Sequence, residues 1–257
     1  MQKESIKFEH STTLEGMTSI RALLSARKNG TNNRPILRVL YDASREKKLE
    51  KELRYLQKMA MEHGFSLDAV TANEIDELSL GNSHGGLVAI CGNRDLPRLN
   101  AEISKIPAGF YVMIQGIEDP YNFGYALRSL YACGADGVIL CERNWLSAAG
   151  VVARASAGAS ELFPVYVSEP EEAVSLFHSI GHTVVCADER TGNILGKTPL
   201  KKPLLLIVGG ERRGISRAVL DQADTLVKIP YGRDFRASLS AASAATIMAY
   251  EIQRQNS

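Results

Sequence analysis

Residues 204–216 read LLLIVGGERRGIS. The five aliphatic residues at the start of this stretch predict a strand that is buried on both faces, as in the middle of a parallel sheet. The glycine-rich GGERRG then predicts a turn, and a helix is expected over 216–223. A buried strand, a glycine turn and a helix in direct succession indicate an α/β fold.

The same alternation extends to both sides of this stretch. We expect a small α/β domain over residues 1–95, a linker over 96–107 marked by Pro97 and Pro107, and a larger α/β domain over 108–257. The larger domain should contain a mostly parallel sheet with helices on both faces. Strands are predicted over 36–41, 65–70, 87–91, 110–115, 137–141, 162–167, 183–187, 204–208 and 225–229, and helices over 15–28, 45–63, 123–133, 146–154, 169–180, 216–223 and 239–254, with a short one starting near Thr71.

The composition is that of an ordinary globular protein. The 257 residues carry 30 basic and 29 acidic side chains and are 45% apolar, which excludes a disordered chain, a collagen-like chain and a disulfide scaffold. The longest aliphatic run is far shorter than the roughly 20 residues of a membrane helix. The first residues, MQKESIKFEH, contain no apolar signal core, so we expect a cytoplasmic protein. Reduced, mostly buried thiols without metal-ligand spacing are expected at Cys91, Cys133, Cys141 and Cys186.

The charge is unevenly distributed along the chain. The first 60 residues carry 13 basic and 7 acidic side chains, whereas residues 61–119 carry 3 basic and 9 acidic ones. In one interpretation, a basic N-terminal face attracts phosphate backbones. In the other, the basic residues between 45 and 58 form the solvated face of one helix and pair with Glu46, Glu50 and Glu52.

A polar turn leads into a helix at residues 116–124, GIEDPYNFG. Asn122 is a candidate cap for this helix, because its side-chain oxygen can accept from a free backbone N–H. Arg128 lies less than two turns further on and carries a fork of donors that suits a phosphate or a carboxylate. A capped helix with an arginine in an ion pair is the structural alternative.

Two further polar segments follow predicted strands, VGGERRGIS at 208–216 and IPYGRDFRASLS at 229–240. In open α/β sheets, ligands bind at the carboxyl ends of strands, and glycine lets a ligand approach the backbone closely. The first segment is neither a P-loop nor GxGxxG, which argues against a nicotinamide-dependent oxidoreductase. Glu211 is suited to a site, although capping the next helix is an alternative. The second segment leads into the small residues AASAA, which also permit a tight helix–helix contact.

In order and spacing, these three segments resemble the SpoU/TrmH family of SPOUT-class RNA methyltransferases. The resemblance covers residues 108–254, and SAGA at 156–159 is similar to a recurrent family stretch. The N-terminal part resembles, more weakly, the ribosomal-protein-like RNA-binding domain that precedes such catalytic domains, through Glu15-Gly16 and the stretch 84–89. The motif residues are Asn122, Gly124 and Arg128 in the first motif, Gly209, Glu211, Gly214, Ile215 and Ser216 in the second, and Ile229, Pro230, Ser238, Leu239, Tyr250 and Glu251 in the third.

The resemblance implies transfer of a methyl group from S-adenosylmethionine to a ribose 2′-hydroxyl of tRNA or rRNA. It also implies a trefoil-knotted C-terminal α/β domain, a homodimer with the active site near its interface, and no metal. The residues that it assigns are Arg128, Asn122, Glu211 and Ser240 to catalysis and Val208, Gly209, Gly214, Ile229, Ser238 and Leu239 to the cofactor. Candidate RNA contacts are Arg21, Arg27, Lys28, Arg143, Arg212, Arg213, Arg233 and Arg236.

A guanidinium is effectively never deprotonated in proteins, so we expect Arg128 to orient the ribose or a phosphate and to stabilise a developing oxyanion. Asn122 and Glu211 would hold Arg128 and the cofactor loop, or Glu211 would accept the hydroxyl proton; the sequence leaves both open. The chain departs from the family at Ser240, where Asn is usual, and the loop between Pro230 and Ser238 is one residue longer than is common. A non-catalytic RNA-binding protein that retains the fold and the pocket is therefore the alternative.

Overall fold

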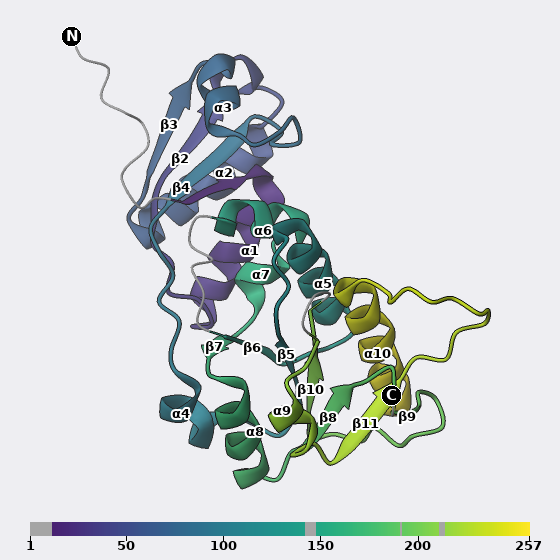
Figure 1. The fold of residues 1–257 in the computed structure, drawn as a ribbon. Coiled ribbons are helices and arrows are strands. Elements are labelled where there is room, and N and C mark those ends of the chain that lie inside the picture. The colour runs from purple at the N-terminus through teal and green to yellow at the C-terminus, as the bar shows by residue number, and fades with distance from the viewer. Residues whose placement is uncertain (1–11, 142–147, 191, 211–213) are drawn as a thin grey trace. The chain divides into compact units, whose positions relative to one another are not determined.

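The computed structural model describes residues 12–141, 148–190, 192–210 and 214–257 (Figure 1). The chain divides into two compact units. The first contains Met1–Asp95 and Asn144–Leu162, and the second contains Leu96–Arg143 and Phe163–Ser257.

The second unit is built on a sheet whose strands run in the order β7-β6-β5-β10-β8-β11-β9, and every pairing among its described residues is parallel. The expected parallel sheet is therefore confirmed. Leu206 in β10 pairs with Val112 of β5 on one side and Val185 of β8 on the other, and all of β5 and β10 is buried. The strands are β5 (Phe110–Ile114), β6 (Gly137–Leu140), β7 (Val165–Val167), β8 (Thr183–Ala187), β9 (Asn193–Ile194), β10 (Leu204–Val208) and β11 (Thr225–Lys228).

Helices cover both faces of this sheet (Figure 1). Alternate strand residues such as Tyr111, Leu205 and Ile207 pack with Phe177 and Val219 in one core, because successive strand side chains point to opposite faces. α5 and α10 pack on each other at the other face. The helices of this unit are α4 (Leu99–Glu102) with a 3-10 turn at Ile103–Lys105, α5 (Pro120–Ala132), α8 (Pro170–Ser179), α9 (Arg217–Leu220) and α10 (Ala241–Gln255).

The first unit is a four-stranded sheet in the order β1-β4-β2-β3. Only the pair of β2 with β3 is parallel among its described strands. Thr71 caps α3 in a capping box with Glu74, which confirms the short helix expected there. The elements are β1 (Thr12–Glu15), α1 (Gly16–Lys28), β2 (Ile36–Asp42), a 3-10 turn (Ala43–Arg45), α2 (Glu50–His63), β3 (Ser66–Val70), α3 (Ala72–Leu78), β4 (Leu87–Cys91), α6 (Ala149–Ala155) and α7 (Ala159–Leu162).

Several predicted boundaries differ from the structure. The helix expected over 45–63 begins at Glu50, because the Asp42 side chain accepts from the Ser44 N–H and closes a 3-10 turn first. The strand expected over 162–167 is only Val165–Val167, because the residues before it form α7. β1 was not predicted from its sequence, since four residues give too little periodicity to detect.

The segment 148–162 packs within the first unit. A Cβ at Gly158 would lie 2.6 Å from the Ala22 Cβ, and Gly158 has φ +85°, so only glycine permits this approach to α1. Asn32 and Arg34 contact Glu161: the Asn32 amide donates to Oε2 at 2.8 Å, and Arg34 Nε donates to the same oxygen at 3.0 Å. The family-like stretch at 156–159 therefore has a packing role.

Arg94 completes this arrangement, which we call the buried arginine cluster: Asn32, Arg34, Arg94 and Glu161. Arg94 donates to the Ser160 and Thr31 carbonyls at 3.0 Å each, and Arg34 Nη1 donates to the Gly92 carbonyl at 3.0 Å. Burial lowers the pKa of Arg94 to about 10, so its guanidinium is still charged at neutral pH. The members of this cluster are scattered along the chain, so no local sequence pattern predicts it.

Among the described residues, no helix is long and apolar enough to cross a membrane, and no group of His, Cys, Asp and Glu has the arrangement of a metal site. Cys91 and Cys186 are buried, and Cys133 and Cys141 are half-buried. The expected linker at residues 96–107, between an RNA-binding and a methyltransferase domain, stays a prediction. The trefoil knot also stays a prediction.

Candidate functional site

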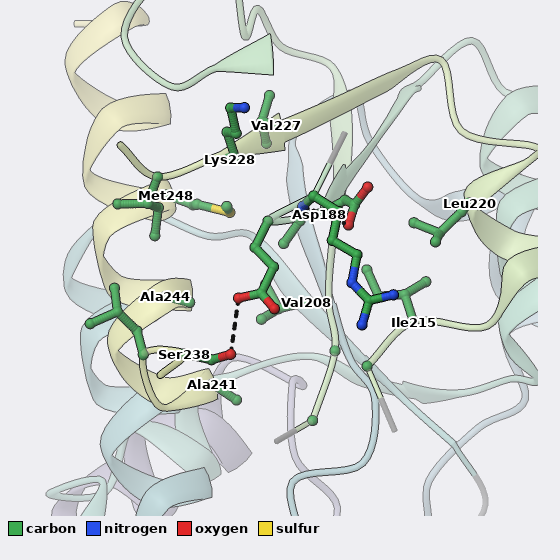
Figure 2. Close-up of a pocket in the computed structure, with 18 of the residues that line it drawn as sticks. Asp188, Val208, Ile215, Leu220, Val227, Lys228, Ser238, Ala241, Ala244 and Met248 are labelled. Carbon is green, nitrogen blue, oxygen red and sulfur yellow. Dashed lines mark hydrogen bonds between the residues drawn. The ribbon is translucent and has the colours of Figure 1, made fainter. Parts of the chain in front are cut away.

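A cavity of about 550 Å³ lies where β8, β10 and β11 end (Figure 2). These strands are neighbours in a parallel sheet, so their carboxyl ends meet at one edge. Helix α10 forms a wall through Ala241, Ala244 and Met248. The cavity belongs to the second unit and stands at the edge where the sequence places a ligand.

The six residues that the resemblance assigns to a cofactor all line this cavity. They come from two segments about twenty residues apart in sequence, and the parallel strands β10 and β11, which flank β8, bring them together. The residues are Val208, Gly209, Gly214, Ile229, Ser238 and Leu239.

The glycines after β10 are required by contacts within the chain. A Cβ at Gly209 would lie 2.5 Å from the Gly214 carbonyl carbon, and one at Gly210 would lie 2.2 Å from the Gly116 oxygen. The Gln115 N–H donates to the Val208 carbonyl at 2.9 Å, so the loop after β5 is drawn against the loop after β10. Close backbone packing, rather than ligand approach alone, explains why glycine occupies both positions.

The loop over residues 229–240, between β11 and α10, has one side-chain hydrogen bond to Glu189 in the cavity lining and one within itself. Ser238 Oγ donates to Glu189 Oε2 at 2.9 Å (Figure 2), and the Leu239 N–H donates to the Tyr231 hydroxyl at 3.1 Å. Between these anchor points the loop projects from the rest of its unit (Figure 1). We call residues 229–240 the aromatic loop, because it carries Tyr231 and Phe235.

Ser240 ends the aromatic loop and caps α10. Its side chain accepts from the Ser243 N–H at 3.2 Å. Ser and Asn are among the strongest N-cap residues and differ little in this role. Ser240 stands between Leu239 and Ala241, which line the cavity, without lining it itself.

The charged residues that line the cavity were not predicted from the sequence. Asp188, Glu189 and Arg190 follow β8, and Arg217 and Lys228 line the cavity from α9 and β11. The signal was present: the strand-like TVVCA is followed by the polar DERTG, which is the same strand-end pattern as in the other two segments. The neighbouring Cys186 is no nucleophile at neutral pH, because burial raises the pKa of its thiol to about 12.

The expected helix cap at Asn122 is wrong. Asp119 caps α5: its Oδ1 accepts from the Asn122 N–H at 2.8 Å, and Pro120 occupies the first turn. Asn122 is instead half-buried in the first turn of the helix, and Arg128 is exposed on the same helix. Neither residue lines the cavity. Glu211, the other polar residue expected in catalysis, lies outside the described residues.

The candidate RNA contacts differ in their surroundings. Arg27 Nη1 donates to the Arg34 carbonyl at 2.7 Å, and the Arg21 guanidinium lies 5.0 Å from the centre of the Tyr55 ring. The remaining described candidates, Lys28, Arg233 and Arg236, are exposed, and Arg143, Arg212 and Arg213 lie outside the described residues. On α2, Glu50 pairs with Arg54 and Glu62 with Lys58, as expected of a solvated helix face.

Comparisons with known proteins converge on one family. The model of the SpoU rRNA Methylase family matches residues 109–250. A putative TrmH family tRNA/rRNA methyltransferase of Bacillus subtilis is 29% identical over 202 residues, covering 77% of this chain and 80% of the relative. The 23S rRNA (guanosine-2′-O-)-methyltransferase RlmB of Shewanella oneidensis is 28% identical over 213 residues, covering 80% and 85%.

Solved structures share the fold. An AdoMet-bound rRNA methyltransferase from Sinorhizobium meliloti superposes with a TM-score of 0.77 at 22% identity, covering 96% of this chain and 88% of that one. The SpoU methyltransferase AviRb from Streptomyces viridochromogenes, in complex with AdoMet, has a TM-score of 0.74 at 24% identity, covering 96% and 91%. Similarity at this level of identity establishes the architecture.

Proposed function

The chain belongs to the SpoU rRNA methylase family, and from this we infer that it transfers a methyl group from S-adenosylmethionine to a ribose 2′-hydroxyl of rRNA or tRNA. The observation that carries the inference is the convergence of the six assigned cofactor residues on one cavity at the carboxyl edge of the sheet. We place this activity in the cytoplasm, where bacterial rRNA and tRNA are made.

The cavity fits the cofactor in size and in chemistry. Its volume of about 550 Å³ falls within the range of roughly 300–1,000 Å³ that is typical of small-molecule sites. Val208, Leu239 and Met248 offer apolar surface for a purine, while Asp188 and Glu189 offer carboxylates for hydroxyl and ammonium groups. When bound, S-adenosylmethionine supplies an electrophilic methyl group on a sulfonium.

The chain's own task is to orient the ribose hydroxyl and to assist the loss of its proton. We assign Arg128 to orientation and to stabilisation of the developing oxyanion, because its guanidinium stays charged. Glu211 either holds Arg128 or accepts the proton, and Asn122 supports the start of the same helix. Ser240 supports the loop by capping α10, a role in which it replaces Asn without loss. Ser240 in place of Asn is therefore no reason to prefer a non-catalytic RNA-binding protein.

We propose a homodimer built on α5 and α10. These helices expose large apolar side chains, namely Tyr121 and Tyr125 on α5 and Ile247 and Tyr250 on α10. Exposed apolar side chains gathered on one packed helix pair mark an interaction surface. Because Arg128 is also exposed on α5, such a dimer brings it to the interface. A Tyr125→Glu variant should be monomeric in light scattering where the wild type is dimeric.

We assign residues 1–95 to binding of the RNA substrate and residues 108–257 to methyl transfer. In residues 1–95, the exposed Lys28 at the end of α1 supplies positive charge for phosphates. In residues 108–257, Arg233 and Arg236 are exposed as well. Arg21, which lies over Tyr55, and Arg27, which holds the Arg34 carbonyl, contribute packing as well as charge.

The decisive experiment incubates the protein with methyl-labelled S-adenosylmethionine and total bacterial RNA, beside an Arg128→Ala variant. Label in RNA that disappears in the variant is the expected result, and digestion to nucleosides should yield 2′-O-methylated product. Label that persists in the variant would remove Arg128 from the mechanism. If the wild type gives no label and Ser240→Asn gives label on the same RNA, the chain is the non-catalytic RNA-binding protein.

A further inference from the structure

The aromatic loop places two exposed rings next to the cavity. Phe235 is 58% exposed and Tyr231 is 39% exposed, and their ring centroids lie 6.2 Å apart with the planes tilted by 53°. Tyr231 also lines the cavity, and its hydroxyl accepts from the Leu239 N–H. The Tyr231 ring is thus held in place by the loop itself, and the Phe235 ring lies beside it without lining the cavity.

Single exposed apolar residues are common, so two exposed rings do not by themselves indicate a binding surface. The residues around them are needed for that inference. Arg233 and Arg236 are interleaved with the aromatic residues, and both are exposed. Asp234 between them reduces the net charge of this short segment, so a general attraction for polyanions is weak here. The combination that remains is two ring faces and two guanidinium groups within six residues, at the mouth of a cavity.

This combination fits an unpaired nucleotide better than it fits a duplex. Every base has a face that can stack on an aromatic ring or a guanidinium plane, and guanidinium groups also bind the adjoining phosphates. In an A-form duplex the base faces are already stacked and its deep major groove excludes side chains.

We propose that Phe235, with Tyr231, is the stacking platform for an unpaired base beside the methylated nucleotide, so that the substrate is a single-stranded or looped segment of RNA. This inference rests on the proposed function and deepens it. Phe235 is the principal stacking residue because it is the more exposed ring. Tyr231 positions it and connects the platform to the cavity, and Arg236 binds a phosphate of the same strand.

The test measures binding of a short mixed-sequence single-stranded RNA, and of the same RNA annealed to its complement, by fluorescence anisotropy over a series of salt concentrations. The variants are Phe235→Ala, Phe235→Leu as the apolar non-aromatic control, Phe235→Trp as the rescuing variant, and Arg236→Gln. Phe235 is exposed, so none of its variants removes a core contact.

The wild type should bind the single strand more tightly than the duplex. Phe235→Ala and Phe235→Leu should weaken single-strand binding by about five-fold or more, without a change in salt dependence, and Phe235→Trp should retain it. Arg236→Gln should instead reduce the slope of log affinity against log salt by about one. Equal binding of single strand and duplex by the wild type, or wild-type affinity of Phe235→Ala or Phe235→Leu, overturns the proposal.

A second readout separates this inference from the proposed function. In the methyl-incorporation assay, Phe235→Ala should raise the KM for RNA and leave kcat and the affinity for S-adenosylmethionine unchanged. An unchanged KM, with an active wild type, overturns the platform and leaves the methyltransferase standing. An inactive wild type whose preference for single strands still depends on Phe235 overturns the activity and leaves the platform standing.

Discussion

Two regions of the molecule use arginine in opposite ways. In the buried arginine cluster, Arg34 and Arg94 are enclosed, and their donors are directed at Glu161 and at backbone carbonyls. In the aromatic loop, Arg233 and Arg236 are exposed beside two exposed rings. A buried guanidinium requires an internal partner for its charge, whereas an exposed one is available to a partner from outside. The difference teaches that burial, and not residue type, separates arginines that hold the fold from arginines that are available to a partner.

The largest expected effect comes from a substitution in the buried arginine cluster. Glu161→Ala removes the anion from Arg34 and leaves a charge buried at 4% exposure, which should cost about 3–5 kcal/mol in the free energy of unfolding. The midpoint of urea unfolding measures the loss. The matched control is Glu50→Ala, which breaks the exposed pair with Arg54 and should cost less than about 1 kcal/mol. Equal shifts in the two variants would show that the buried pair has no special role.

The second prediction compares a packed glycine with an open one. A Cβ at Gly210 would lie 2.2 Å from the Gly116 oxygen, whereas nothing lies within 4 Å of one at Gly232 in the aromatic loop. Gly210→Ala should therefore cost about 1–3 kcal/mol of stability and weaken S-adenosylmethionine binding, because the loops after β5 and β10 must separate. Gly232→Ala should change stability by less than about 1 kcal/mol. Thermal unfolding measures the stability of each variant, and calorimetric titration measures its affinity for S-adenosylmethionine. Wild-type stability and affinity in Gly210→Ala would contradict the close packing at this position.

The third prediction concerns the junction of the aromatic loop with α10. Ser240→Ala removes the side-chain oxygen that accepts from Ser243, which should cost about 1 kcal/mol. Ser240→Asn keeps an acceptor and should stay within a few tenths of a kcal/mol of the wild type. Thermal unfolding of the three proteins tests this order. A Ser240→Asn variant as unstable as Ser240→Ala would mean that capping is not the role of this position.

The smallest expected effect is the pH dependence of stability that comes from the exposed Arg254 and its partner Glu251. The hydrogen bond from Arg254 is the largest cause that lowers the pKa of Glu251 to about 2, and the hydrogen bond from Gln255 is the next. Gln255 also donates to the Thr198 carbonyl. Because the pKa in the folded protein is depressed, the stabilisation is fully present above the usual value of 4.5 and is lost as pH falls toward about 2. Glu251→Gln should remove this pH-dependent loss of stability. Melting temperatures followed from neutral to acidic pH should converge for the two proteins; parallel curves would refute the assignment.

Much of the fold was predictable because its signals are local. The aliphatic run Leu204–Val208 predicted a buried parallel strand, and the structure places it near the centre of the second sheet. Gly64 ends α2 in a left-handed conformation, as the sequence indicates. The meeting of the two motif segments at the cavity was predictable as well, because both motifs stand directly after strands, and parallel strands gather their carboxyl ends at one edge.

The sequence by itself determined the alternation of strands and helices, the parallel sheet, the family and the segments that meet at the cavity. Each of these follows from periodicity or from residues adjacent in the chain. Only the tertiary structure decided that Asp119 rather than Asn122 caps α5 and that Glu161 holds Arg34 across 127 residues. These outcomes depend on which polar groups become buried together, and burial is a property of the packed chain that no local pattern encodes.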